Sequence, residues 1–97
     1  MNNGMIHQLA EQFARRVQRE AGADPGRQIE WAYAAALSRP PTDEERGIAR
    51  AELKKLTGQW TKHLAGTGKP DKEQAAIQAL ATLCHAILNS AEFLYVD

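Results

Sequence analysis

Apolar residues recur every three to four positions along most of the chain, a spacing that places them on one face of an α-helix. Four segments show this pattern, and the alternation typical of strands is nearly absent. The four predicted core stripes are Ile6, Leu9, Phe13 and Val17, widened by Ala10, Ala14 and Ala21; Ile29, Ala32, Tyr33, Ala36 and Leu37; Ile48, Leu53, Leu56, Trp60 and Leu64; and Ile77, Leu80, Cys84, Ile87 and Leu88. The sequence therefore predicts an all-α fold, a compact bundle of four main helices.

Capping and helix-breaking residues indicate where these helices begin and end. Gly22 is expected to end the first helix. Asp24 suits the N-cap of the second helix and Pro25 its first position. Gly66 is expected to end the third helix, and Asp71 can cap the fourth. The connections are short, so residues 1–97 are expected to form a single helical domain.

The sharpest local signal lies between the second and third helices. Pro40 and Pro41 should end the second helix near Ser38, because proline lacks an amide donor and restricts the residue before it. Thr42 and Glu45 match a capping box, in which each side chain accepts a hydrogen bond from the other residue's backbone amide. Pro40, Pro41, Thr42 and Glu45 are therefore predicted to be a structural junction that fixes the angle between two helices.

The second helix carries apolar residues on two faces. Trp31, Ala34 and Ala35 lie opposite its main stripe. A helix that is apolar all round is normally buried on all sides. Either this helix passes through the centre of the bundle, which we expect, or its second face is a docking surface.

The C-terminal segment is the other candidate for a docking surface. Asn89 or Ser90 is expected to interrupt the fourth helix, leaving residues 91–97 as a short turn and an extended tail. Phe93, Leu94 and Tyr95 make this segment apolar, and Met1 and Met5 add apolar residues at the other end of the chain. We predict a contiguous apolar patch near Trp31 or this tail, covered by another domain or by self-association, because such patches usually mark contact surfaces.

Net charge and hydropathy exclude two classes of partner. Twelve basic and twelve acidic residues cancel, so no long-range attraction to nucleic acid or anionic lipid is expected. No apolar run approaches the roughly 20 residues needed to span a bilayer, so no membrane insertion is predicted. Arg46, Arg50 and Lys54 form a row that could meet phosphates or an acidic partner, although the flanking glutamates favour a solvated face.

Cys84 and His85 are the residues that most resemble a chemical site. The pentapeptide ATLCH has Ala81 in place of the first cysteine of a C-x-x-C-H haem motif. Neighbouring residues on a helix point about 100° apart, so His85 is poorly placed to activate Cys84, and only a distant His7 or His63 stays open as its base. The spacing fits no zinc motif. We predict a buried, inert Cys84 with His85 at the rim, and no catalytic, cofactor-binding or metal-ligating residue.

Three stretches together resemble a known family. MNNGMIHQLAEQFARRV, QIEWAYAAALSRPPTDEERGIA and LCHAILNSAEFLYVD are similar, in the same order, to the C-terminal region of the planctomycete family catalogued as domain of unknown function 1553. The shared features are an asparagine-containing start, an L-x-R-x-P-T-x-x-E junction and an L-N-S-x-E-F-x-Y-V-D ending. The resemblance covers nearly the whole chain, and its ending is the most specific part.

The resemblance implies a context rather than a reaction. Members of that family are long, multidomain and exported, and some carry a cytochrome-c-like domain elsewhere. It gives no catalytic residue to transfer. The chain is then expected to be a C-terminal fragment of an extracytoplasmic or cell-envelope protein, with the other domains of that protein as its partners. We expect a non-enzymatic structural or docking module; the alternative is a non-catalytic part of an enzyme whose active site is completed by other domains.

Overall fold

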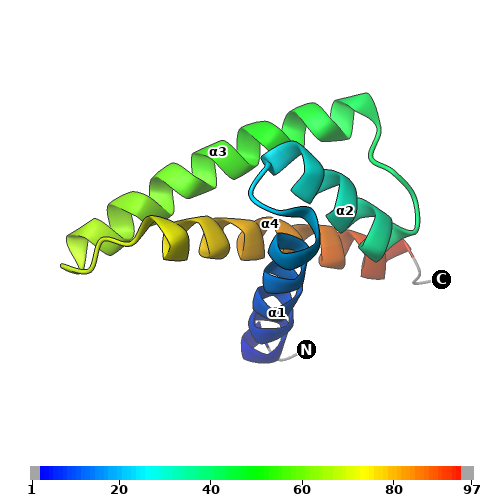
Figure 1. Ribbon diagram of the computed structural model, residues 1–97. Coiled ribbons are helices and arrows are strands. Elements are labelled where there is room, and N and C mark those ends of the chain that lie inside the picture. The colour runs from blue at the N-terminus through cyan, green and yellow to red at the C-terminus, as the bar shows by residue number, and fades with distance from the viewer. Residues whose placement is uncertain (1–2, 95–97) are drawn as a thin grey trace.

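The chain folds into four helices joined by short connections (Figure 1). They are α1 (Asn3–Ala21), α2 (Pro25–Leu37), α3 (Asp43–Gly66) and α4 (Lys72–Leu94). The computed structural model describes the backbone of residues 3–94 and the side chains of residue 5 and residues 7–90. Over residues 3–94 there is no strand, and the predicted all-α fold is confirmed.

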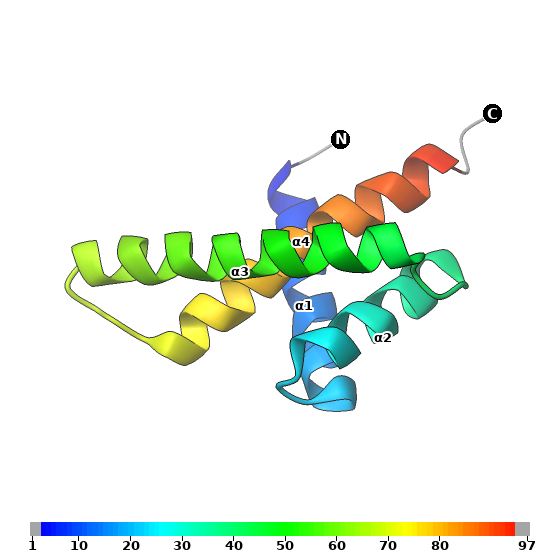
Figure 2. The ribbon, with the colours of Figure 1, turned by 90° about the horizontal axis from the view of Figure 1, so that it is seen from above.

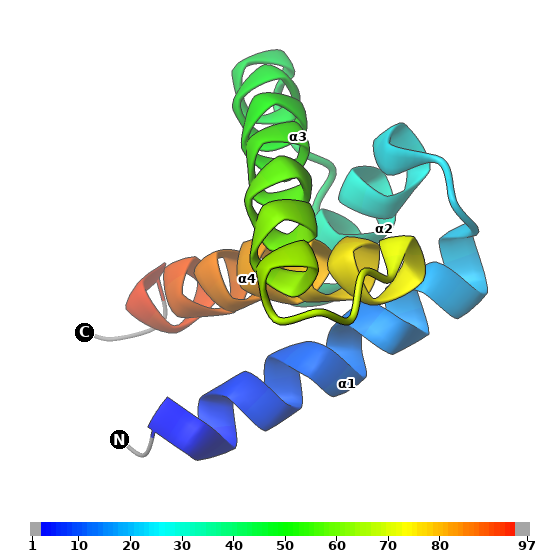
Figure 3. The same ribbon diagram turned by 90° about the vertical axis from the view of Figure 1, so that its left-hand side faces the viewer.

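Helix α4 occupies the centre of the molecule. It packs against each of the other three helices, whereas α1 and α3 do not pack against one another within the described residues. Seen from above, α3 crosses over α4 and α1 passes beneath both (Figure 2), and a side view shows α4 between them (Figure 3). The buried apolar residues of α4 lie on more than one of its faces; they are Ala75, Ile77, Ala79, Leu80, Ala81, Leu83, Cys84 and Ile87.

The sequence predicted that the second helix passes through the centre of the bundle, but α4 occupies that position instead. Helix α2 buries Ile29, Ala32 and Leu37 as predicted, but Ala34 and Ala35 are exposed. The physical reason is that an alanine buries only a methyl group, so leaving two of them in water costs little. Helix α4 has larger apolar residues around its circumference, and enclosing it removes more apolar surface from water.

One large residue in each of the predicted stripes of α1 and α3 does not face the core. Helix α1 buries Ala10 and Val17 of its predicted stripe but not Leu9, and α3 buries Leu53 as predicted and Ala49 in place of Ile48. Leu9 is instead 53% exposed and Ile48 is 59% exposed. In both helices the next residue along the chain, an alanine, has taken the inward position. A small side chain allows the helix axes to approach closely, and this contact outweighs the burial of one larger residue.

The helix ends follow the capping signals except at the end of α4. The Asp24 carboxylate accepts a hydrogen bond from the Arg27 amide at 3.3 Å, and α2 ends before Ser38, which has a left-handed backbone with φ of 58°. Helix α4 continues through Asn89 and Ser90 to Leu94, so the predicted break is wrong. Asparagine and serine each cost less than about 0.7 kcal/mol in a helix, too little to end one.

Candidate docking surface

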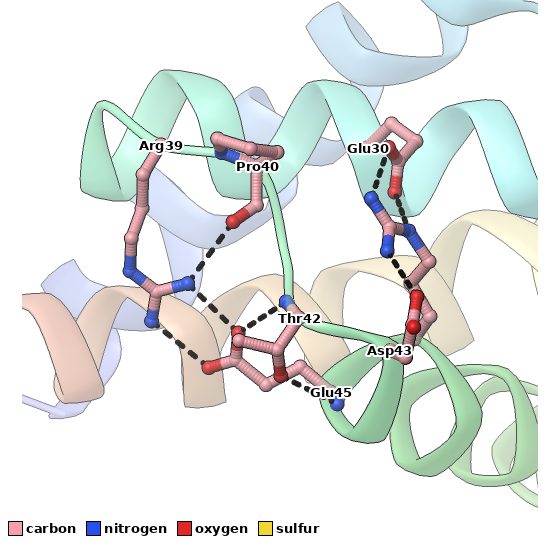
Figure 4. A network of polar contacts seen from close by, with 7 residues as sticks. Glu30, Arg39, Pro40, Thr42, Asp43 and Glu45 are labelled. Atoms are coloured by element: carbon pink, nitrogen blue, oxygen red, sulfur yellow. Dashed lines mark hydrogen bonds and ion pairs between the residues drawn. The ribbon is translucent and has the colours of Figure 1, made fainter.

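The junction between α2 and α3 is held by a closed network of polar contacts (Figure 4). Thr42 Oγ1 accepts a hydrogen bond from the Glu45 amide at 3.1 Å, and Glu45 Oε1 accepts one from the Thr42 amide at 2.8 Å. The predicted capping box is therefore present. Pro41 is buried beside it, whereas Pro40 and Thr42 are exposed. These four residues form the structural junction that the sequence indicates.

Arg39 adds a contact that the capping box alone does not predict. Its two terminal nitrogens donate to the two Glu45 carboxylate oxygens at 2.8 and 2.9 Å, and Nη1 also donates to the Pro40 carbonyl at 3.1 Å. The hydrogen bond from Arg39, followed by the one from the Thr42 backbone, lowers the pKa of Glu45 to about 2. The guanidinium thus joins the end of α2 to the start of α3. The sequence signal is the arginine placed directly before the double proline.

A second ion pair ties the same two helices further along. Arg46 Nε and Nη2 donate to the Glu30 carboxylate at 2.8 and 3.1 Å, and Arg46 Nη1 donates to Asp43 at 2.8 Å. The hydrogen bond from Arg46 lowers the pKa of Glu30. The charges of Arg39 and Glu45 neutralise one another, whereas Arg46 shares its single positive charge between the carboxylates of Glu30 and Asp43. Both sets of ion pairs join α2 to α3 and stabilise the angle between them.

Cys84 and His85 do not form a reactive pair. Cys84 is fully buried on α4, and burial raises the pKa of its thiol to about 12, so the nucleophilic thiolate is not populated at neutral pH. His85 is half-buried at the rim, and His7 and His63 are exposed on α1 and α3. Among the described residues, no three His, Cys, Asp or Glu side chains are grouped so that they could hold a metal ion.

Trp31 lies on the surface between α1 and α2. It is half-buried, with its ring centroid 5.9 Å from that of Phe13, and the Arg16 guanidinium lies 5.5 Å from the Trp31 ring centroid. The contact with Arg16 is a cation–π interaction. Trp31 was predicted to share a docking surface with Phe93, Leu94 and Tyr95. The side chains of those three residues lie outside the described part of the chain.

Exposed apolar residues of α1 extend the surface around Trp31. Met5 is 60% exposed and Leu9 is 53% exposed. Met5, Leu9 and Phe13 are each four residues apart, so they form one row along the helix that leads to the Trp31 ring. We call Met5, Leu9, Phe13 and Trp31 the apolar strip. The sequence pattern had placed Leu9 and Phe13 in the core, whereas Met5 and Trp31 were among the residues expected on a contact surface.

Comparison with known proteins adds no relative: no family model, no curated protein and no solved structure matches this chain. Among the described helices, none combines the length and the apolarity needed to cross a membrane. Function must therefore be inferred from the surface itself.

Proposed function

We propose that this chain is a non-enzymatic helical docking module and that the apolar strip is its contact surface. The observation that supports this proposal is the exposure of Met5 and Leu9 in one row with the Phe13–Trp31 aromatic pair. Contiguous apolar residues at a surface mark contact sites more often than scattered ones do. Aromatic residues such as Trp31 also supply much of the binding energy in protein interfaces.

The partner we propose is another domain of a larger planctomycete protein that is exported or held in the cell envelope. This part of the proposal rests on the three stretches that resemble the planctomycete family. A neighbouring domain suits the strip because it is always present at high effective concentration, so a small apolar contact is enough to hold it. Self-association through the same strip is the alternative way to cover it.

A photo-crosslinking amino acid at position 9 of the complete protein tests this proposal. We expect irradiation to join position 9 to a defined set of residues of another domain, identified by mass spectrometry. Position 55 is the matched control, because Lys55 is exposed on α3 and lies away from the strip. Products that join two copies of position 9 would indicate self-association instead. Two results would refute a docking role. Either the crosslinker at position 9 reacts with water alone and joins no other residue, or positions 9 and 55 give the same crosslinked products.

A further inference from the structure

A groove of about 570 Å³ opens on the molecule at a place separate from the apolar strip. Its lining residues come from the last turns of α1, the loop that follows, the start of α2, the middle of α3 and the first turns of α4. The groove exists because α1 and α3 do not pack directly together in the described part of the chain. Its size is within the range of about 300–1,000 Å³ typical of ligand-binding clefts.

The floor of the groove is apolar and built from short side chains. Ala23, Pro25, Ala51 and Ala76 contribute to it, together with the buried Leu53. None of these residues has a side-chain polar atom that would need a hydrogen-bond partner. The floor can therefore accept one or two branched apolar side chains without leaving a polar group unsatisfied.

The turn beside the groove is held in place before any partner binds. Gln28 is 6% exposed, and its Nε2 donates to the Gly22 carbonyl at 2.6 Å. Asp24 lies three residues after Ala21, the last residue of α1, and caps the start of α2. Both contacts fix the segment that carries Ala23 and Pro25. A preformed groove binds with less loss of conformational entropy than one that must first be ordered.

One wall of the groove carries uncompensated positive charge. Arg50 and Lys54 are exposed and lie one helical turn apart on α3. In the described part of the chain, neither of them belongs to an ion pair. Arg46, the preceding member of the same row, is neutralised by Glu30 and Asp43. Arg50 and Lys54, which line the groove, are therefore the two members of this row that can pair with the anions of a partner.

Arg50 also reaches across the groove towards α2. A Cβ atom at Gly26 would lie 3.0 Å from Arg50 Nη1, so the guanidinium passes over the first turn of that helix. The neighbouring Asp24 carboxylate is engaged in capping, where it accepts from the Arg27 amide. The α2 N-terminus is thus already capped, and the Arg50 guanidinium, which forms no ion pair in the described part of the chain, is the group at this side of the groove that favours an incoming carboxylate.

We infer that this groove binds an acidic amphipathic helix of a protein partner. A leucine-sized side chain fills the floor, and two carboxylates of the partner helix pair with Arg50 and Lys54. Glutamates at i and i+4 of a helix lie about 6 Å apart, which matches the spacing of two cations one turn apart on α3. An apolar anchor flanked by charge is the usual way in which a helix occupies a groove. Charge complementarity is the reason for preferring this partner over a neutral or basic one.

The test uses a fluorescein-labelled helical peptide with glutamates at i and i+4 around a central leucine, and fluorescence anisotropy as the readout. A peptide with lysines in place of the glutamates, and one with alanine in place of the leucine, serve as controls. We expect the acidic peptide to bind more weakly by about tenfold when Arg50→Glu and Lys54→Glu are combined. The combined Lys55→Glu and Lys62→Glu variant changes the net charge equally at exposed positions of α3 outside the groove and should bind normally.

A steric variant tests the floor independently of charge. Ala51 is exposed at the groove, so Ala51→Trp should fill it while circular dichroism shows the helices intact. We expect that variant to lose binding of the acidic peptide. Three results would overturn the inference: no binding by a panel of such peptides with the leucine at different positions, equal binding to the Arg50→Glu, Lys54→Glu variant and its control, or unchanged binding to Ala51→Trp. Binding of octanoate measured by calorimetry, with no binding of any peptide, would assign the groove to small anions instead.

Discussion

Thr42 contributes to stability through one well-defined contact, the hydrogen bond that its hydroxyl accepts from the Glu45 amide. Thr42→Ala should lower the free energy of unfolding by about 1 kcal/mol, because that amide loses its partner at the start of α3. Urea denaturation measures the change. Thr61→Ala is the control: Thr61 is exposed within α3, and alanine is the better helix former there. Equal stabilities of the Thr42→Ala variant and the wild type would mean that the cap contributes nothing.

Glu45 makes stability depend on pH in a specific acidic range. Its pKa is about 2 in the folded protein, below the ordinary value of 4.5, so the unfolded chain binds the proton more readily. The stabilisation is fully present above about pH 5 and is lost as the pH falls towards 2. We expect Glu45→Gln to be less stable than the wild type at pH 7, and the difference to shrink steadily below pH 5.

Urea denaturation at a series of pH values measures this difference. Glu52→Gln is the matched control, because Glu52 is an exposed glutamate of α3 that has no ion-pair partner among the described residues. The free energy of unfolding of Glu52→Gln should change with pH in the same way as that of the wild type. Parallel curves for Glu45→Gln and the wild type would show that the bond to Arg39 does not contribute.

Cys84 should behave as a core residue in chemical labelling. It is fully buried, and a pKa of about 12 leaves almost no thiolate at neutral pH. We expect reaction with a maleimide to be slow in the native protein and to accelerate strongly in urea, because labelling must wait for the core to open. Similar rates with and without urea would contradict the burial of this thiol.

At the scale of single elements, Ser38 at the end of α2 and Ser90 within α4 give opposite expectations for a substitution by glycine. Ser38 holds a φ of 58°, a conformation that glycine adopts without the steric cost of a Cβ, so Ser38→Gly should raise the melting temperature slightly. Ser90 lies inside α4, so Ser90→Gly should lower it. Thermal denaturation followed by circular dichroism compares the two. A loss of stability in Ser38→Gly larger than in Ser90→Gly would reverse both assignments.

Most helix ends were easier to predict than the face that each helix turns towards the core. Proline, the capping box and Asp24 act within a few residues, so the sequence locates the ends of α2 and the start of α3. The rotation of a helix about its own axis depends on the helices that it packs against. Leu9 and Ala10 both lie on the predicted stripe of α1, and only the packing of α1 against α4 decides that Ala10 faces inward. In α3 the inward position of Ala49 follows the helical spacing of Leu53, Leu56 and Trp60, a signal that the predicted stripe missed by including Ile48.

At the scale of the whole molecule, the central position of α4 decides which surfaces remain open. It separates α1 from α3 in the described part of the chain, which leaves both the groove at Arg50 and Lys54 and the outer face of α1 exposed. The pairing of Glu30 with Arg46 across two helices likewise depends on the final packing. Such contacts between distant residues have no local signal, so the sequence indicated Met5 and Trp31 but not the row through Leu9 and Phe13 that joins them.

Labelling of a cysteine at position 9 tests the docking role of the apolar strip most directly. In a Cys84→Ala background, Leu9→Cys places a thiol at the exposed centre of the α1 row. We expect it to react with a maleimide about as fast as a free thiol in the 97-residue chain alone. In the longer protein that we propose, the proposed partner domain should slow the reaction at least roughly tenfold by covering the strip. Equal, fast labelling in both would show that the strip is open surface and would contradict its role in docking.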